Sequence, residues 1–270
     1  MGIAIAGLAG LLLGMAQAPA TDAPPPPAYG TGPDPLVMKD GRACLEEIEA
    51  CFAVVEGEFD PERRRIAITA MDDPDDVKHE DLRDSPRLDE SLAMWPFALK
   101  LPLDDPEISG WLIGVASTKT VAALQSGGQG ARLRLHLLLV GRVGSISDAL
   151  IDLPWQSSID QLACQSEEDA ARRLQVCNDR FTFDTSLALA SGQRGVWLPD
   201  LVYTAVAGAY PQTARLWEDP DSDRQLGPED LSFWRDPECS YSRILRFNPA
   251  TRRYEMDRPA PDCHAYSVHD

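Results

Sequence analysis

The residues most able to do chemistry lie in one acidic stretch. Residues 218–230 read EDPDSDRQLGPED, with aspartates at every second position and carboxylates again at the end. Oxygen ligands are what Ca²⁺ takes in proteins, and alternating positions let one loop supply several of them. The stretch therefore raises the hypothesis of a calcium site.

The spacing can be compared with the calcium loop of EF-hands, which has ligands at positions 1, 3, 5, 7, 9 and 12 and glycine at 6. On that spacing the carboxylate candidates are Asp219, Asp221, Asp223 and Asp230. Arg224 occupies the position of the glycine, where it adds a Cβ and a positive charge. Asp230 is shorter than the usual bidentate glutamate. We therefore expect no calcium binding, and the alternative interpretation is an Asp-Pro turn before a short helix that starts at Gly227-Pro228.

Known catalytic and phosphate-binding motifs are absent or incomplete. No Gly-x-Ser-x-Gly elbow occurs, and Ser117-Thr118-Lys119 is one residue short of the Ser-x-x-Lys motif of penicillin-recognising enzymes. The glycine-rich stretch 127–130 precedes a strand-like run rather than a helix whose N-terminus would hold a phosphate. We expect no cofactor.

The histidines single out no active site; they are His79, His136, His264 and His269. His136 alternates with leucines and stands beside Arg134, which predicts an exposed side chain. His264 and His269 lie in the last residues, where fraying is expected. A Ser/His/Asp site assembled in space would leave no local signature, so the catalytic residues, if any, stay unknown.

Cysteine usage is the clearest structural signal, and the six residues are Cys44, Cys51, Cys164, Cys177, Cys239 and Cys263. An even number without any Cys-x-x-C pair predicts three disulfides in an oxidising compartment. Cys239 and Cys263 flank a hairpin that turns near Pro249, so we expect these two to be bonded to each other.

The pairing of the other four cysteines stays open. A disulfide requires Cα atoms within about 7 Å. An intact helix over Ser166–Cys177 would put Cys164 and Cys177 roughly 15–20 Å apart, and an intact helix between Cys44 and Cys51 would separate them by about 10 Å. Either these helices are shorter than they look, or the four cysteines pair across the fold. A free thiol is the third alternative.

The N-terminal residues predict export. The first 20 residues carry no charged side chain, and the apolar run Ile3–Met15 precedes Ala18-Pro19-Ala20. This pattern is typical of a signal peptide over 1–20 that is cleaved before Thr21. The run is shorter than the ~20 apolar residues that span a bilayer. Because the stretch lacks Lys and Arg, an uncleaved anchor stays as an alternative. A proline-rich, disordered leader is predicted over 21–35.

The formal net charge of −18 restricts the partners. It repels the phosphates of nucleic acids and the surfaces of anionic membranes. An unknown protein or small ligand remains as partner, with no nucleic acid and no transmembrane segment after signal removal. The localisation expected from these signals is periplasmic or secreted.

The remaining chain, 36–270, is predicted to form one α+β domain that is rich in antiparallel strands and hairpins, with one or two short helices and stabilising disulfides. Alternating leucines over Leu133–Val140 and the run Ser145–Leu153 predict paired strands. Ser166 predicts a helix N-cap. The acidic segment Met71–Glu90 predicts an exposed loop. The alternative is a subdivision of this domain near 125–130.

Two hairpins share a pattern. Cys51 and Cys239 are each followed, eight residues later, by Phe and then by Asp-Pro or Asn-Pro. An internal repeat or the independent use of one favourable turn would explain this. Taken together, the sequence predicts an exported, non-enzymatic binding or envelope-associated protein, with a hydrolase as the alternative. A pocket with a histidine beside Ser or Asp would favour the hydrolase, and an exposed aromatic patch would favour binding.

Overall fold

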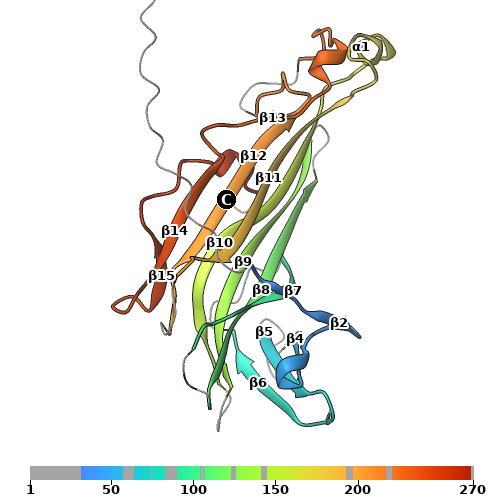
Figure 1. Cartoon of the computed structure of the whole chain (residues 1–270). Coiled ribbons are helices and arrows are strands. Elements are labelled where there is room, and N and C mark those ends of the chain that lie inside the picture. The colour runs from blue at the N-terminus through green and yellow to red at the C-terminus, as the bar shows by residue number, and fades with distance from the viewer. Residues whose placement is uncertain are drawn as a thin grey trace, which may run out of the picture.

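The fold is seen in a computed structural model (Figure 1). It describes residues 32–56, 64–73, 75–82, 90–103, 105, 107–122, 126–140, 145–192, 197–216 and 221–268. The expected signal peptide, most of the leader, and His269 lie outside the described residues. So does Asp219 of the acidic stretch.

One large antiparallel sheet forms most of the molecule. Its strands are, in spatial order, β1 (Asp34–Pro35), β7 (Glu90–Lys100), β8 (Ser109–Ala122), β9 (Ser126–Val140), β10 (Ser145–Leu162), β11 (Asn178–Leu189), β12 (Leu201–Tyr210), β14 (Tyr241–Asn248) and β15 (Arg253–Met256), with the short β13 (Trp234–Arg235) also paired to β12. From β7 to β12 each strand pairs with the next in sequence. The possible subdivision near 125–130 falls in the hairpin between β8 and β9, which pair on both sides of it.

A second, smaller sheet is also an antiparallel meander. It contains β2 (Val37–Lys39), β3 (Arg42–Leu45), β4 (Ala50–Glu56), β5 (Arg64–Ala70) and β6 (Val77–Asp81). Figure 1 shows this sheet beside one end of the long strands and the helix α1 at their other end. The described residues contain one α-helix, α1 (Glu167–Arg172), and three single-turn 3₁₀ helices at Glu46–Ile48, Pro228–Asp230 and His264–Tyr266. The fold is therefore β-rich and antiparallel, and the α+β assignment fits it only loosely.

Two hydrophobic cores lie on opposite faces of the large sheet. On β8, Trp111 and Ile113 pack into the core under the small sheet, whereas Leu112 between them packs into the other core. Alternate side chains of a strand point to opposite faces, so both faces of this strand are buried. The core on the far face includes Trp95 of β7 as well as Tyr254 of β15. Because residues near both edges share this core, the large sheet curls around it.

The helix predicted over Ser166–Cys177 is shorter in the structure. Ser166 is its N-cap and accepts a hydrogen bond from the Asp169 backbone N–H at 3.1 Å. The helix ends at Arg172, and Leu174 and Gln175 have positive φ angles of 51° and 68°. This turn brings the chain back, so Cys164 and Cys177 are bonded with Cα atoms 4.9 Å apart.

The other two disulfides are also local. Cys44 and Cys51 are directly opposite each other on β3 and β4 and are bonded, with Cα atoms 3.9 Å apart. The segment between them is a 3₁₀ turn rather than the helix considered from sequence. Cys239 is bonded to Cys263, the pair that the sequence analysis expected, with Cα atoms 5.7 Å apart.

Two boundaries differ from the sequence analysis. Asp34 and Pro35, assigned there to the leader, pair with Ala98 and Phe97 of β7. The acidic segment Met71–Glu90 was expected to be a loop, yet it contains β6. All five residues of β6 are exposed. An edge strand tolerates charged side chains because one long side and much of both faces remain in water.

Candidate ligand cavity

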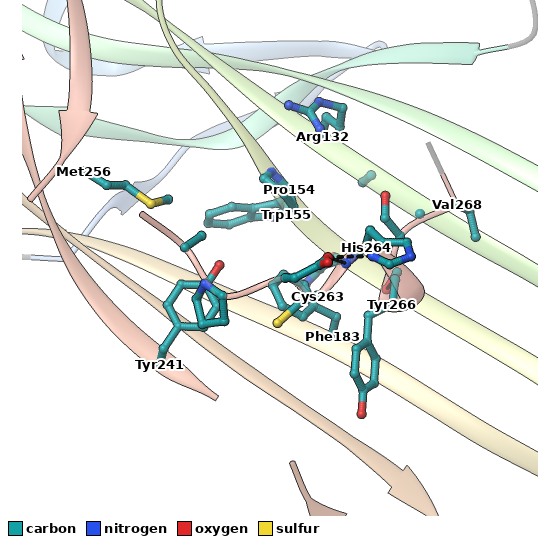
Figure 2. A pocket seen from close by; sticks show the side chains of 18 residues that line it. Arg132, Pro154, Trp155, Phe183, Tyr241, Met256, Cys263, His264, Tyr266 and Val268 are labelled. Atoms are coloured by element: carbon teal, nitrogen blue, oxygen red, sulfur yellow. Dashed lines mark hydrogen bonds and ion pairs between the residues drawn. The ribbon is translucent and has the colours of Figure 1, made fainter. Parts of the chain in front are cut away.

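A cavity of about 260 Å³ lies between the large sheet and the chain segment that follows β15 (Figure 2). We call this segment, Asp257–Val268, the strap. Strands β9, β10 and β11 form the floor of the cavity, β14 and β15 form one wall, and the strap forms the cover. The cavity is therefore enclosed by residues far apart in the sequence.

Aromatic side chains cover much of the floor and wall, and they are Trp155, Phe183 and Tyr241. The half-buried indole of Trp155 is supported from the core by Trp95, whose ring packs edge-on at 5.4 Å between centroids. The backbone of Trp155 is fixed as well, since its carbonyl oxygen accepts a hydrogen bond from Thr185 Oγ1 at 2.6 Å. Trp155 is thus held in place from two sides and presents a rigid apolar surface to the cavity.

A β-bulge positions this floor. Pro154 pairs with Arg132 of β9, but Gln156 pairs with Ala131, so Trp155 is an extra residue on β10. Such a bulge bends a strand and re-aims its side chains. Tyr203 of β12 supports the bulge by donating a hydrogen bond from its hydroxyl to the Pro154 carbonyl oxygen at 2.8 Å. Burial strongly raises the pKa of the Tyr203 phenol, so this hydroxyl stays protonated and remains a donor.

The strap is attached first near Pro259. The Pro259 carbonyl oxygen accepts hydrogen bonds from Nε and Nη2 of Arg243 at 3.2 and 3.1 Å. The disulfide between Cys239 and Cys263 follows four residues later. Because Arg243 is buried and the disulfide is covalent, this part of the strap has two independent anchors.

A second set of anchors lies around Tyr266. Its hydroxyl donates to Asp236 Oδ2 at 2.9 Å, while Asp236 Oδ1 accepts from the backbone N–H groups of Glu238 and Cys239. Burial raises the pKa of Tyr266, and its hydrogen bond to Asp236 adds to the effect. Ser157 of β10 donates to the Tyr266 carbonyl oxygen. The buried Asp236 thus organises both the disulfide and the end of the strap.

The glycine-rich stretch 127–130 now has a structural role. A Cβ placed on Gly130 would collide with Val268, and one on Gly128 would lie 3.1 Å from the same side chain. The lack of a side chain at both positions lets Val268 pack directly on β9. These glycines therefore seat the strap on β9.

Two charged residues line the cavity, Arg132 on the floor and Asp262 on the cover. Arg132 on β9 donates from Nε to Asp152 Oδ1 at 3.0 Å, and Arg134 donates from Nε to the other oxygen at 3.3 Å. Asp262 on the strap accepts a hydrogen bond from His264 Nδ1 at 2.5 Å. This hydrogen bond lowers the pKa of Asp262, so the carboxylate stays ionised at neutral pH.

The histidines are distributed over two cavities. His264 was expected to fray, but it begins a 3₁₀ turn in the strap. His136 was expected to be exposed, but its side chain is buried and its Nδ1 lies 3.1 Å from the Ser147 carbonyl oxygen. The reason is that the small sheet covers this face of β9, which the alternation of leucines does not reveal. His136 and His79 line a second, more polar cavity of about 590 Å³ between the sheets.

Hydroxyl groups near these histidines are engaged by the backbone. Ser147 Oγ donates to the Asp148 carbonyl oxygen at 2.6 Å and accepts from the Leu137 N–H at 3.0 Å. Ser157 Oγ donates to the strap, as noted above. A serine nucleophile must instead give its proton to a base. Neither serine is arranged as an activated nucleophile.

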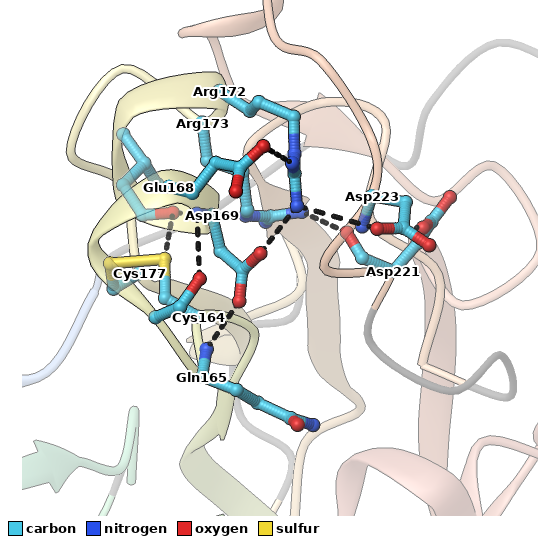
Figure 3. Close-up of polar contacts among 11 residues, drawn as sticks. Cys164, Gln165, Glu168, Asp169, Arg172, Arg173, Cys177, Asp221 and Asp223 are labelled. Carbon is cyan, nitrogen blue, oxygen red and sulfur yellow. Dashed lines mark hydrogen bonds and ion pairs between the residues drawn. A yellow bond between two sulfur atoms is a disulfide. The ribbon is translucent and has the colours of Figure 1, made fainter.

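The acidic stretch is tied to the end of the molecule that carries α1 (Figure 3). Asp223 Oδ1 accepts from Arg172 at 3.3 Å, and the Asp221 carbonyl oxygen accepts from Arg173 at 2.8 Å. Asp230 Oδ2 caps the following 3₁₀ turn through the Gly227 N–H at 2.9 Å. Arg224, at the glycine position of a calcium loop, donates to the Thr213 carbonyl oxygen at 2.6 Å.

These contacts describe a docked loop rather than a converging set of ligands. In the part of the chain that the structure describes, no group of three or more His, Cys, Asp or Glu side chains is placed to hold a metal ion. Asp219 lies outside that part, so the expected lack of calcium binding stays a prediction. The alternative interpretation from sequence, a turn followed by a short helix, agrees with the 3₁₀ helix Pro228–Asp230.

Exposed aromatic side chains are scattered. Among the described residues, Trp197 and Phe233 have exposed fractions of 51% and 49%, and Phe97, on a different strand (β7), has 36%. Trp197 precedes the first residue of β12, whereas Phe233 packs over Gly208 near the last. A strand rises by about 3.4 Å per residue, so the two lie near opposite ends of β12. They do not combine into one patch, and the cavity remains the place where aromatic groups gather.

Sequence reasoning missed the residues of the cavity. Arg132 and Asp262 are 130 positions apart, and neither belongs to a motif. The two signals that point toward the cavity are the disulfide between Cys239 and Cys263, which fixes the strap, and the glycine-rich stretch on which the strap packs.

Comparison with known proteins adds no further constraint. No protein-family model, no curated protein and no solved structure matches the chain. Among the described residues, no helix combines the length and the apolar character that a membrane crossing requires. Functional inference therefore depends on the cavity itself.

Proposed function

We propose that the protein is an exported binding module whose ligand occupies the cavity between the large sheet and the strap. The observation that carries this proposal is the aromatic floor under a disulfide-anchored cover. Ligand sites are typically concave and mainly apolar, with a few polar groups that fix orientation. Trp155, Phe183 and Tyr241 supply the apolar part, while Arg132 and Asp262 supply the polar part.

The size of the cavity limits the ligand. Its volume of about 260 Å³ lies just below the range of roughly 300–1,000 Å³ that is usual for ligand pockets. In liquid water, the same volume would hold roughly nine molecules at ~30 Å³ each. A molecule with one ring and short substituents fits this space. The two acyl chains of a diacyl lipid do not.

A hydrolase is the second candidate because His264 and Asp262 form a close pair at the cavity wall. Their side chains have exposed fractions of 71% and 81%, and Ser157, which lines the same cavity, donates to the backbone. These features support binding over catalysis. If the protein is a hydrolase, it will turn over small chromogenic esters, and His264→Ala will abolish that turnover. An activity that the variant retains would come from elsewhere.

Export is part of the proposal and has its own test. It is supported by the signal-like N-terminal sequence and by the bonding of all six cysteines in three disulfides. Disulfides persist in the periplasm and outside the cell but are rare in the cytosol. Mass spectrometry of the protein from its native cell should find a chain that begins at Thr21. An intact Met1 on a cytoplasmic species would contradict export.

Binding in the cavity can be tested with a library of single-ring compounds, screened by NMR. Some compounds should shift the indole resonance of Trp155. Ala131→Leu should abolish these shifts because Ala131 lines the cavity and the larger side chain fills it. Ala53→Leu in the small sheet is the matched control and should leave binding intact. If no compound binds, or if binding survives in the filled variant, the cavity is not the site.

A further inference from the structure

We propose that the cavity recognises a zwitterion: a molecule with a carboxylate at one end, an ammonium group at the other, and about one ring of apolar structure between them. This inference depends on the proposed binding function and specifies its ligand. It follows from the charged residues on the floor and on the cover, the aromatic side chains of the floor, and the volume of the cavity.

The positive side of the cavity is Arg132. Asp152 is shared between two guanidinium groups, one from Arg132 and one from Arg134, so it neutralises neither completely. Among the described residues, Arg132 makes its hydrogen bond through Nε, and its two terminal nitrogens bond to no other side chain or backbone group. Two parallel N–H donors match the two oxygens of a carboxylate. We therefore assign the ligand carboxylate to Arg132.

The negative side of the cavity is Asp262. Both of its side-chain hydrogen bonds come from His264 and fall on the same oxygen, Oδ1. No other group in the described part of the chain bonds to Oδ2. An ammonium group carries three donors and would bind this oxygen directly. The ligand ammonium is therefore assigned to Asp262.

The cavity has one charged residue on its floor and one on its cover, and its floor also carries aromatic side chains. Arg132 comes from β9 and Asp262 from the strap, and Figure 2 shows the side chains of Arg132, Trp155 and His264 apart from one another among the residues that line the cavity. A flat apolar body can stack on Trp155, and ring pairs of this kind are stabilised beyond the area that they bury. A ligand whose two charges are separated by such a body meets all three features at once.

A ligand with one charge fits less well. The net charge of −18 repels an anion as it approaches the protein. A cation is attracted at long range, but Arg132 repels it inside the cavity. A zwitterion has no net charge and pairs with both Arg132 and Asp262. Of these three kinds of charged ligand, only the zwitterion avoids repulsion both by the whole chain and inside the cavity.

The test uses four ring compounds of nearly equal shape, titrated by calorimetry into the full-length protein. They are 4-(aminomethyl)benzoate with both charges, 4-methylbenzoate with the negative charge, 4-methylbenzylamine with the positive charge, and neutral 4-methylbenzyl alcohol. The zwitterion should bind about tenfold more tightly than 4-methylbenzylamine, which lacks the hydrogen-bonded pair with Arg132. It should bind about two- to fivefold more tightly than 4-methylbenzoate, because Asp262 is largely exposed and an exposed ion pair contributes less. L-Phenylalanine, whose charges share one carbon, should bind more weakly than 4-(aminomethyl)benzoate.

Two variants test which residue of the cavity binds each charged group of the ligand. Arg132→Gln should weaken binding of 4-methylbenzoate and of the zwitterion but not of 4-methylbenzylamine. Asp262→Asn should weaken binding of 4-methylbenzylamine and of the zwitterion but not of 4-methylbenzoate. Arg180→Gln and Asp160→Asn are matched controls, because these two residues form an exposed ion pair outside the cavity. Neither control should change any affinity.

The outcomes separate this inference from the proposed function. If the neutral alcohol binds as tightly as the zwitterion and Ala131→Leu abolishes both, the cavity is the site but the charge assignment is wrong. Tighter binding of L-phenylalanine would overturn the separation of the charges. If none of these compounds binds while other single-ring compounds still occupy the cavity, only the zwitterion inference fails. The proposed function fails as well if no compound occupies it.

Discussion

The end of the molecule at α1 and the cavity under the strap are built from the same parts but use them differently. Each joins distant segments, carries a disulfide, and places aspartates beside arginines. At α1, Arg173 donates to Asp179, to the Val176 carbonyl oxygen and to the Asp221 carbonyl oxygen. At the cavity, Arg132 is held through one nitrogen.

This difference shows how to separate structural charges from charges available to a ligand. The α1 end has the residue types that suggest ion binding, but its aspartates and arginines hold one another and the backbone. The cavity has fewer charged residues, and part of each remains open. The residue type indicates what chemistry is possible, whereas the unused hydrogen-bonding capacity indicates where a ligand can bind.

The largest effect on stability is expected from Arg173→Met. Arg173 is buried and pairs with Asp179, so the variant leaves a buried carboxylate without its cation. Breaking such a pair typically costs about 3–5 kcal/mol of unfolding free energy. Denaturant unfolding at pH 7 measures this loss. Arg172→Met is the control; Arg172 is partly exposed, so its loss should cost about 1 kcal/mol or less.

The loss in Arg173→Met should depend on pH. Burial raises the pKa of Asp179, and the Arg173 guanidinium opposes the rise. Without the arginine the folded-state pKa rises further, so the folded variant binds a proton more readily than the unfolded chain. Acidification from pH 7 toward the unfolded pKa of about 3.9 should therefore reduce the deficit relative to wild type. A deficit that is constant over this range would contradict the burial of an uncompensated charge.

The second effect is expected from Cys239→Ser combined with Cys263→Ser. The bond closes a sequence separation of 24 residues, so its loss should lower the unfolding free energy by about 3 kcal/mol. Ligand binding in the cavity should also be lost because the strap loses an anchor. Removing Cys44 and Cys51 together is the control; it should destabilise by a similar or smaller amount and leave binding unchanged. Equal binding in both double variants would show that the strap does not need its disulfide.

A smaller effect is expected from Asp169→Asn, in the first turn of α1. The hydrogen bond from the Gln165 N–H is the main reason that the pKa of Asp169 is lowered, followed by contacts with Ser166 and Arg172. A lowered folded-state pKa contributes stability above the unfolded pKa and loses it as the pH falls through the folded value. The variant should therefore be less stable than wild type at pH 6 and match it in strong acid. Glu167→Gln, in the same turn, should show little difference at either pH.

The smallest effect is expected from calcium. Isothermal titration should detect no saturable binding below about 0.1 mM, and Asp221→Ala should behave like wild type. The reason is that Arg224 adds a Cβ and a charge at the tight-turn position, while Asp230 is committed to the Gly227 N–H. Saturable binding that disappears in Asp221→Ala would show that the aspartates at the α1 end are available to a ligand, as the charged groups of the cavity are.

Local features of the fold are readable from the sequence. The period-two leucines of β9 and the hairpin near Pro249 both form as predicted, because strand patterning and turn residues act over a few positions. The N-cap at Ser166 forms for the same reason. The end of that helix is not readable, since Leu174 and Gln175 adopt positive φ without the glycine that usually marks such a turn.

Features that depend on two distant segments are not readable. Alternation places His136 and Arg134 on one face of β9, but only the position of the small sheet decides that this face is covered. The two similar hairpins illustrate the same limit. Cys51 is bonded seven residues back to Cys44, whereas Cys239 is bonded 24 residues forward to Cys263, so the shared pattern belongs to the turns and not to the disulfides.

The position of the strap has a consequence for the order of folding. Ser157 and Tyr266, which join the floor to the strap, are separated by 109 residues, whereas neighbouring strands of the meander are joined by short connections. Local hairpins close quickly, and contacts between distant residues must pay a larger loop-closure entropy first. The sheet should therefore form while Trp155 and Phe183 are still open to solvent. Until the strap docks, this aromatic surface is where a folding intermediate would aggregate or be held by a chaperone.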